Sequence, residues 1–282
     1  MSDGGRLVVC ATPIGNLGDV TLRVLEALRA ADTIAAEDTR VTSKLLARYE
    51  IATRLERCDE HTVERQAPKL VARMLAGEVI AFVSDAGTPG VSDPGARLIA
   101  AAVEGGVPIE TLPGASALLA ALVASGLPMQ RFFFGGFLPR KAGERRRELE
   151  SVSALDATLV YFESPHRAAA SLETIAEVMP GRQAVLAREL TKLHEEVVRG
   201  TVEDVAQQIA ERTSLKGEVV LLIGPPLARA RVRANESELQ AMIDALVSEG
   251  VSKSEAVKRV SAETGVARSE VYEVAHRSRS NG

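Results

Sequence analysis

The chain has 282 residues, which is long for a single hydrophobic core, so we expect two or three domains. Its hydrophobic content of 46% is ordinary for a globular protein, whereas only 3% of residues are aromatic and tryptophan is absent, which argues against a wide base-stacking platform. The net charge of −4 neither indicates nor excludes a nucleic-acid partner, because such binding depends on a local basic patch.

The cysteines and the apolar runs indicate the compartment. Cys10 and Cys58 lie in separate stretches without a CxxC spacing, so we expect free buried thiols in a reducing cytoplasm and no metal site. The run LVVCA is too short for a signal peptide, and no stretch approaches the roughly 20 apolar residues of a membrane span. We therefore expect a cytoplasmic protein with no membrane partner.

Short apolar runs alternate with helical patterns from the start of the chain. Several of these runs are continuous, which is typical of strands covered on both faces in an α/β protein. The predicted strands are RLVVCA (6–11), TIAAE (33–37), VIAFVS (79–84), FFFGG (132–136), TLVYFE (158–163), AVLARE (184–189) and EVVLLIG (218–224).

Helical patterns fill the spaces between these strands. In TLRVLEALRAAD (21–32) three leucines fall on one stripe. Further helices are predicted at 67–77, 93–106 and 115–126, and each ends at or next to a glycine, which is a common helix terminator. The order β-α-β-α predicts an α/β fold with mostly parallel strands.

The pattern changes along the chain and suggests three domains. Helices and strands alternate strictly up to about residue 115, whereas TKLHEEVVRGTVEDV (191–205) predicts a hairpin-like pair of strands followed by a helix. The Pro-rich, basic stretch 225–233 is typical of a linker. We predict an α/β domain at 1–114, a second, mixed α/β domain at 115–225, and a small helical domain at 235–282.

The last 50 or so residues predict three short helices. NESE (235–238) and SKSE (252–255) both match the capping box, and a third helix is expected near Ala267, after Gly265. The segment 255–275 has the helix, turn and helix of a helix-turn-helix. A helical cap or a dimer element without nucleic-acid contact is the alternative, because nine basic and eight acidic residues make 229–279 nearly neutral.

The stretch VSDAGTPGVSDPG (83–95) follows the apolar run VIAFV and contains three glycines and two prolines. Ligands bind beyond the carboxyl ends of strands in open α/β sheets. Glycine lets the main chain approach a ligand, and proline fixes the path of the loop before binding. The stretch therefore predicts a small-molecule cradle made of main chain, with a plain tight turn as the alternative.

Two further loops have the same character. CATPIGNLGD (10–19) follows the first strand, and LPGASALLAAL (112–122) turns at Gly114 into a helix with Ser116 in its first turn. Neither G-x-G-x-x-G nor G-x-x-x-x-G-K-[ST] occurs, which argues against a Rossmann dinucleotide site and against P-loop ATP chemistry. Three such loops after three strands predict one shared ligand pocket.

An ordered set of motifs then resembles a known family. TPIGNLGD, AEDTR, SDAGTPGVSDPG, PGAS, FFFGGFLPRK, YFESPHR and ARELTKLHEE are similar to the tetrapyrrole-methylase superfamily, over roughly residues 6–224. Within it they resemble the branch that methylates small-subunit ribosomal RNA, which carries an appended helix-turn-helix domain. The resemblance implies a two-domain methylase fold, with a mostly parallel first sheet and a mixed second sheet. It also implies S-adenosylmethionine as cofactor, a cytidine 2′-hydroxyl of 16S ribosomal RNA as acceptor, and a homodimer.

The resemblance also implies positions that contact the cofactor. The triplet 87–89 reads GTP where tetrapyrrole enzymes often have GDP, so Thr88 replaces an acid, and Glu163 stands where relatives often have an apolar residue. The implied contacts are Pro13, Ala86, Gly87, Thr88, Val91, Ser116, Ala117, Glu163 and Leu190.

A ribose hydroxyl is a poor nucleophile while it is protonated, so a base is useful. We place Asp38, Glu163 and Arg167 first as catalytic residues, because AEDTR (36–40) and YFESPHR (161–167) end strands. An N-cap with a surface ion pair is the alternative for AEDTR, and a helix-start role is the alternative for His166. The full set of candidate bases is Asp19, Glu37, Asp38, Asp85, Glu163, Glu189 and His194.

A basic cluster at 131–147 could bind RNA, because it holds six Lys/Arg against one acid in a chain that is acidic overall. A solvated helix face is the alternative. The predicted RNA contacts are Arg140, Lys141, Arg145, Arg146 and Arg147.

Three functions remain open from the sequence. The leading one is an S-adenosylmethionine-dependent RNA 2′-O-methyltransferase that acts on 16S ribosomal RNA or on the small ribosomal subunit. A methyltransferase for a tetrapyrrole ring and a non-enzymatic DNA-binding regulator are the alternatives. The basic cluster and the C-terminal helices favour RNA over a tetrapyrrole.

Overall fold

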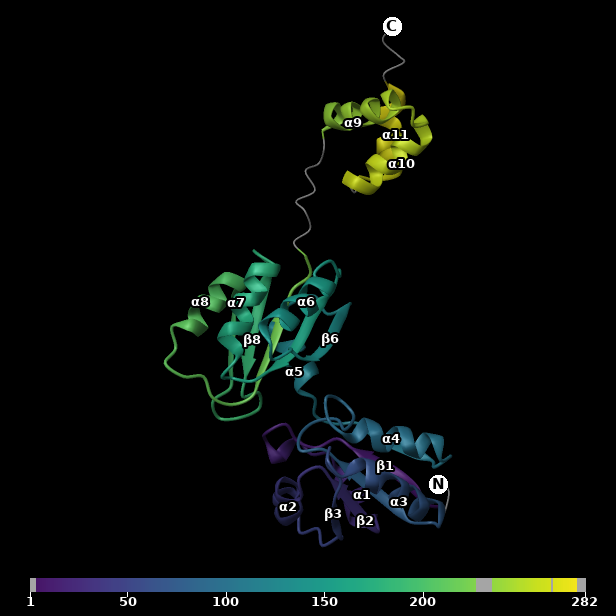
Figure 1. Ribbon diagram of the computed structural model, residues 1–282, viewed down its shortest axis with the longest axis vertical. Coiled ribbons are helices and arrows are strands. Elements are labelled where there is room, and N and C mark those ends of the chain that lie inside the picture. The colour runs from purple at the N-terminus through teal and green to yellow at the C-terminus, as the bar shows by residue number, and fades with distance from the viewer. Residues whose placement is uncertain (1–3, 227–234, 265, 278–282) are drawn as a thin grey trace. The chain divides into compact units, whose positions relative to one another are not determined.

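The structure, a computed structural model, describes residues 4–226, 235–264 and 266–277 (Figure 1). The chain divides into two compact units, residues 1–225 and 226–282. The predicted boundary between residues 114 and 115 stays a prediction. It falls in the loop that joins the two sheets of the first unit.

The first sheet is entirely parallel, with the strand order β3-β2-β4-β1-β5. Its three central strands, β2, β4 and β1, are buried on both faces, as their continuous apolar runs predict. Leu, Ile and Val side chains at alternate strand positions pack against α1 and α2 on one face and against α3 and α4 on the other. The elements are β1 (Arg6–Cys10), η1 (Leu17–Asp19), α1 (Leu22–Ala30), β2 (Thr33–Ala36), α2 (Thr39–Arg48), β3 (Leu55–Arg57), α3 (Val63–Leu75), β4 (Val79–Val83), α4 (Gly95–Glu104) and β5 (Ile109–Leu112).

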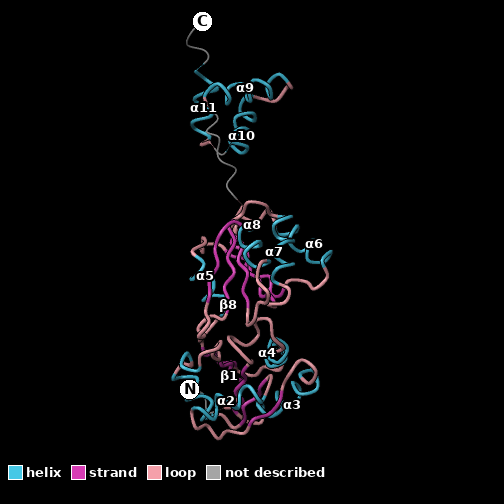
Figure 2. Tube along the Cα trace, turned by 90° about the vertical axis from the view of Figure 1, so that its left-hand side faces the viewer, coloured by secondary structure: helices cyan, strands magenta, loops and turns pink. Residues whose placement is uncertain are grey.

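The second sheet is mixed, with the order β6-β7-β10-β8-β9; only β6 and β7 pair in parallel. Helix α5 covers one face, and α6, α7 and α8 cover the other (Figure 2). The elements are α5 (Ala117–Ser125), β6 (Phe132–Phe137), α6 (Ala142–Val152), β7 (Thr158–Glu163), α7 (Ala168–Val178), β8 (Gln183–Arg188), β9 (Glu196–Thr201), α8 (Val202–Ala210) and β10 (Val219–Ile223).

The pairing direction of β10 matters for function. Val219, at its start, pairs with Glu163 at the end of β7 and with Arg188 at the end of β8. The amino end of β10 therefore lies at the same edge of the sheet as the carboxyl ends of β7 and β8.

The predicted strands and the α/β class are confirmed, and the predicted parallel first sheet and mixed second sheet are confirmed as well. The hairpin predicted within 191–205 is wrong in position. Strands β8 and β9 form the hairpin, residues 189–195 are its turn, and α8 already begins at Val202, because Thr201 and Asp204 form a capping box there. The sequence also failed to predict β3 and α2.

Three helices make up the described part of the C-terminal unit: α9 (Glu236–Ser248), α10 (Lys253–Thr264) and α11 (Arg268–Arg277). Their core includes Ile243, Val260 and Val271, all fully buried. Asn235 makes both halves of the predicted capping box, and Ser252 Oγ accepts the N–H of Glu255 at 3.4 Å. Gly265, the predicted break, lies outside the described residues, and the helix-turn-helix role stays a prediction.

Both cysteines are free and buried, Cys10 under α1 and α2 and Cys58 under α3. Burial raises the pKa of Cys10 to about 12 and that of Cys58 to about 11. Among the described residues, no helix is long and apolar enough to cross a membrane.

Candidate functional site

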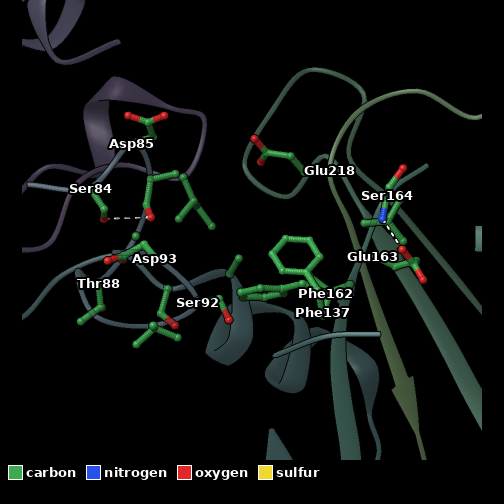
Figure 3. Close-up of a pocket in the computed structure, with 18 of the residues that line it drawn as sticks. Ser84, Asp85, Thr88, Ser92, Asp93, Phe137, Phe162, Glu163, Ser164 and Glu218 are labelled. Atoms are coloured by element: carbon green, nitrogen blue, oxygen red, sulfur yellow. Dashed lines mark hydrogen bonds between the residues drawn. The ribbon is translucent and has the colours of Figure 1, made fainter. Parts of the chain in front are cut away.

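A cavity of about 390 Å³ lies between the two sheets, at the carboxyl edge of the first. The glycine- and proline-rich loop after β4 forms one wall. The ends of β6 and β7 and the start of β10 form the other (Figure 3). Its residues include Ile14, Glu37, Ser84, Asp85, Ala86, Gly87, Thr88, Val91, Ser92, Asp93, Ser116, Ala117, Phe137, Phe162, Glu163, Ser164, Gly217, Glu218, Val219 and Val220.

Hydrogen bonds hold the loop after β4 in shape. Thr12 and Gly87 exchange two main-chain hydrogen bonds, of 2.9 and 3.0 Å, which tie this loop to the loop after β1. Gly87 has φ +78°, a left-handed conformation that favours glycine. The Asp93 carboxylate accepts the N–H groups of Gly90 and Gly95 at 2.7–2.9 Å. The wall is therefore organised before a ligand binds.

The second wall is more apolar. Phe162 packs edge-on against Phe134 and Phe137, with ring centroids 4.9 and 5.6 Å apart. Ser116 caps α5, and its hydroxyl accepts the N–H of Leu119 at 3.4 Å. The cavity thus combines aromatic faces, small side chains and exposed main chain.

Most of the predicted cofactor positions meet at this cavity. Pro13 lines an adjacent cavity instead. Leu190 lines neither cavity, because its side chain is 8% exposed and packs in the core under the second sheet. The residues that do line it are Ala86, Gly87, Thr88, Val91, Ser116, Ala117 and Glu163.

The Glu163 carboxylate is fully buried and occupied by internal partners. It accepts the N–H of Ser164 at 2.7 Å, the hydroxyl of Ser171 at 2.5 Å, and the guanidinium of Arg167 at 2.8–2.9 Å. Figure 3 shows this carboxylate turned away from the Asp85 wall. Arg167 also bonds the carbonyl oxygen of Leu138. These contacts give the predicted catalytic pair a structural role, in which it fixes the turn after β7.

Asp38 also has a structural role, because it is the N-cap of α2 and forms a surface ion pair, which is the alternative that the sequence left open for AEDTR. It caps α2 by accepting the N–H of Arg40 at 2.8 Å, and it pairs with the Arg40 guanidinium at 2.5 Å. The hydrogen bonds from Arg40 hold the pKa of Asp38 well below its ordinary value. Asp38 is therefore a weak proton acceptor, and it is not among the residues that line either cavity.

Glu37 and Asp85 are two of the acidic residues that line the cavity; of the others, Asp93 and Glu163 are held by hydrogen bonds within the protein and Glu218 pairs with Lys192. Glu37 and Asp85 lie just beyond the carboxyl ends of the neighbouring strands β2 and β4, and the N–H of Asp85 donates to Glu37 Oε2 at 3.3 Å. Partial burial raises the pKa of both carboxyls, and the negative charges nearby add to the increase. Asp85 Oδ1 also accepts the N–H of Asp38 at 2.9 Å.

The remaining candidate bases do not compete with this pair. Asp19 and His194 are exposed. Glu189 is paired with Lys192 at 2.8 Å, and that hydrogen bond lowers the pKa of Glu189.

A second cavity, of about 430 Å³, adjoins the first. Loop residues after β1 and one side of α2 line it, and Lys192 reaches it from the second sheet. The Lys192 ammonium pairs with Glu189 at 2.8 Å and with Glu218 at 3.2 Å, and its side chain lies across Gly15. A Cβ at Gly15 would be 2.4 Å from Lys192 Cε, so a larger residue there would displace the lysine.

The predicted RNA-binding cluster needs a correction. Arg145 is only 6% exposed and packs under α7, where its guanidinium donates to Thr174 Oγ1 at 3.0 Å and to the carbonyl oxygen of Ala170 at 3.2 Å. Arg146 pairs with Glu177, and Lys141 with Glu144 at 3.1 Å. Arg140 and Arg147 are exposed. The prediction for Arg145 is wrong, because this residue shares the buried stripe of Leu149 and Val152 on α6.

Replacing Arg145 by alanine should therefore lower the free energy of unfolding by about 2–3 kcal/mol, since buried hydrogen bonds and packing are lost together. Arg147→Ala, at an exposed position of the same helix, should change it by less than about 0.5 kcal/mol. Urea unfolding of both variants measures the difference. Equal midpoints would contradict the buried role of Arg145.

Comparison with known proteins identifies the family of this chain. Residues 6–206 match the family model for Tetrapyrrole (Corrin/Porphyrin) Methylases. Among solved structures, the methyltransferase CobJ is similar, with a TM-score of 0.60 and 24% identity over 79% of this chain and 95% of that one. A uroporphyrin-III C-methyltransferase from Thermus thermophilus, complexed with S-adenyl homocysteine, has a TM-score of 0.56 and 19% identity over 78% and 97% of the two chains. The chain belongs to the tetrapyrrole methylase family.

Curated relatives within this family match most of the chain, and they confirm its resemblance to the ribosomal RNA branch. Ribosomal RNA small subunit methyltransferase I of Mesorhizobium japonicum is 47% identical over 89% of this chain and 86% of its own length. The protein of that name from Bacillus subtilis is 39% identical over 98% and 95% of the two chains.

Sequence reasoning missed part of the site. Gly217, Glu218 and the start of β10 line the cavity from the amino end of a strand, where a parallel sheet would place no ligand. No signal in the sequence alone gives the direction of β10. The side of α2 that lines the second cavity was also missed, although its residues follow AEDTR directly.

Proposed function

We propose that this protein transfers a methyl group from S-adenosylmethionine to 16S ribosomal RNA of the small ribosomal subunit, at the ribose 2′-hydroxyl of a cytidine. The observation that carries the proposal is the 47% and 39% identity, over nearly the whole chain, to two proteins named for methylating this RNA. The similar tetrapyrrole methyltransferases are only 18–24% identical and share the fold.

The first cavity fits the cofactor. Its volume of about 390 Å³ lies within the usual range for small-molecule sites. The Ala86–Thr88 main chain, Ser116 and Ala117 would hold the cofactor, and Phe137 and Phe162 offer apolar faces to its adenine. S-adenosylmethionine supplies an electrophilic methyl group on a sulfonium centre. Because the Glu163 carboxylate is neutralised by Arg167, it does not bind that cation in the ground state, where tight binding would slow transfer.

Glu37 and Asp85 are suited to accept the hydroxyl proton. A general base works best when its pKa is near the working pH, and the pKa values of these two carboxyls are raised from their ordinary range. Their hydrogen bond through the Asp85 N–H fixes them next to each other at the edge of the cavity.

Tritiated methyl transfer to small ribosomal subunits that lack the modification tests the proposal. Nuclease digestion should yield labelled 2′-O-methylcytidine, and no labelled nucleoside should form when the protein is left out. The proposal is refuted if the label is found on a base, or if neither free 16S RNA nor small subunits become labelled.

The C-terminal unit should not be needed for cofactor binding, because all residues of the first cavity lie between positions 14 and 220. A chain that ends at Pro226 keeps the complete first unit and should bind S-adenosylmethionine with the affinity of the full chain. Titration calorimetry measures both. A truncated chain that is folded but does not bind would contradict this assignment.

The proposal has two further parts, a homodimer and a cytoplasmic location. The resemblance to the ribosomal RNA branch supports the first, and the two free, buried cysteines support the second. Sedimentation equilibrium of the purified chain tests the first, since a dimer has twice the 30.0 kDa mass of the chain. Cell fractionation tests the second.

A further inference from the structure

The two cavities share one wall. Both are lined by Ile14, Ser84, Asp85, Ala86 and Glu218. Group transfer requires the acceptor atom to lie next to the donor, in line with the bond that breaks. Two adjoining cavities with a common wall meet this requirement, whereas a smaller hollow around Arg131 and Asp156 shares no residue with the first cavity.

The second cavity is bordered by a basic helix face. Arg40, Lys44 and Arg48 follow each other at intervals of four residues, so they lie on one face of α2. All three are exposed, and α2 contains no acidic residue. Lys44 itself lines the cavity together with Val41 and Leu45. Arg40 is paired with Asp38, while no ion pair with a described residue occupies Lys44 or Arg48.

This charge distribution assigns the two cavities different ligands. The methyl donor carries a sulfonium cation, so the cavity that the basic face of α2 borders is the less favourable one for it. Phosphate groups of an RNA strand are attracted to that basic face. The cluster at 140–147 fits RNA less well, since Arg145 is buried and Arg146 and Lys141 are paired.

We propose that the second cavity receives the target nucleotide of the RNA, and that Lys44 and Arg48 on α2 bind the phosphates of the single strand that flanks it. This inference rests on the proposed function and names the acceptor side of the same site. The ribose then lies against the shared wall, where Asp85 faces both cavities. A nucleotide can enter such a cavity only after it has left its base stack, so the substrate segment is unpaired.

Neutralising these two cations tests the inference. Lys44→Gln/Arg48→Gln removes two charges at i and i+4 on α2, and glutamine is compatible with an exposed helix. Arg65→Gln/Lys69→Gln is the matched control, because it removes two exposed charges with the same spacing on α3, which lines neither cavity. Filter binding of unmodified 16S RNA at several salt concentrations, calorimetry with S-adenosylmethionine, and initial rates are measured for each variant.

The loss of two phosphate contacts to a single strand should reduce the slope of log affinity against log salt by about 1.4, and should weaken RNA binding about 25-fold near 0.1 M salt. KM for RNA should rise by a similar factor while kcat and the affinity for S-adenosylmethionine stay unchanged. The α3 variant should match the unmodified protein in every measurement.

The outcomes separate the two proposals. If the unmodified protein methylates 16S RNA and the α2 variant retains the salt slope and KM of the α3 variant, the acceptor site is overturned and the function stands. If the unmodified protein binds S-adenosylmethionine but methylates neither 16S RNA nor small subunits, the proposed function fails, and the acceptor site fails with it.

Discussion

Replacing Asp85 by asparagine should reduce the rate of methyl transfer by about 10²–10⁴-fold, which is the usual contribution of a positioned general base. In the protein, Asp85 Oδ1 accepts the N–H of Asp38 at 2.9 Å. An asparagine side chain can still accept this hydrogen bond, but it cannot take a proton from a hydroxyl. Cofactor affinity should stay the same. Glu37→Gln should cause a similar loss, and the double variant should lose little more if the two carboxyls act as one unit.

The pH dependence gives a second measurement of the same assignment. A base must be deprotonated to act, so a raised pKa moves the acidic limb of kcat/KM above the ordinary carboxyl range near pH 4. The stability of the fold changes with pH in the opposite direction to the activity. A carboxyl whose pKa is higher in the folded than in the unfolded state stabilises the fold at low pH, and this contribution is lost as the pH rises through the folded value. Asp85→Asn should therefore be at least as stable as the unmodified protein at neutral pH.

Asp38→Asn is the matched control for this experiment. Asparagine is also a good N-cap, so the variant loses the ion pair with Arg40 but keeps the start of α2. We expect nearly full activity. The opposite result, in which Asp38→Asn loses most of the activity and Asp85→Asn keeps it, would show that Asp38 is the base.

Replacing Glu163 by alanine should lower the free energy of unfolding by about 3–5 kcal/mol, the usual cost of removing one partner from a buried ion pair. The change leaves the N–H of Ser164, the Ser171 hydroxyl and the Arg167 guanidinium without their acceptor. Glu163→Gln should cost less, because its amide oxygen can still accept one or two of these bonds. Urea unfolding at neutral pH measures both.

Removing both charges isolates the pair. Glu163→Gln/Arg167→Met should recover part of the stability that Glu163→Gln loses, because no unpaired charge then stays buried. The affinity of folded Glu163→Gln for S-adenosylmethionine should remain unchanged if only the main chain at 163 faces the ligand. A large loss of affinity with unchanged stability would show instead that the carboxylate itself binds the cofactor.

Most strands of the fold could be predicted from the sequence, because they are short apolar runs separated by segments that contain glycine and proline. The same feature located the ligand cavity, since VSDAGTPGVSDPG follows a strand that is buried on both faces. Spacing could also have identified the buried arginine. Arg145, Leu149 and Val152 stand at i, i+4 and i+7, which places the charge on the apolar stripe of α6.

Other features depend on geometry that a single sequence does not contain. Glu37 and Asp38 are neighbours at the end of β2, and residues that follow each other near a strand end point in different directions. Only the structure shows that Glu37 faces the cavity and that Asp38 caps α2. The antiparallel direction of β10, which brings Glu218 to the ligand edge, likewise follows from long-range pairing.

Two buried thiols, Cys10 in β1 and Cys58 directly after β3, can report the opening of the packing around the first sheet. Burial raises the pKa of both thiols, so the thiolate, which is the reactive form, is scarce at neutral pH. Alkylating reagents thus modify them only when the packing around them comes apart. Because Cys10 lies beneath α1 and α2 and Cys58 beneath α3, each labelling rate records the loosening of a different face of the same sheet.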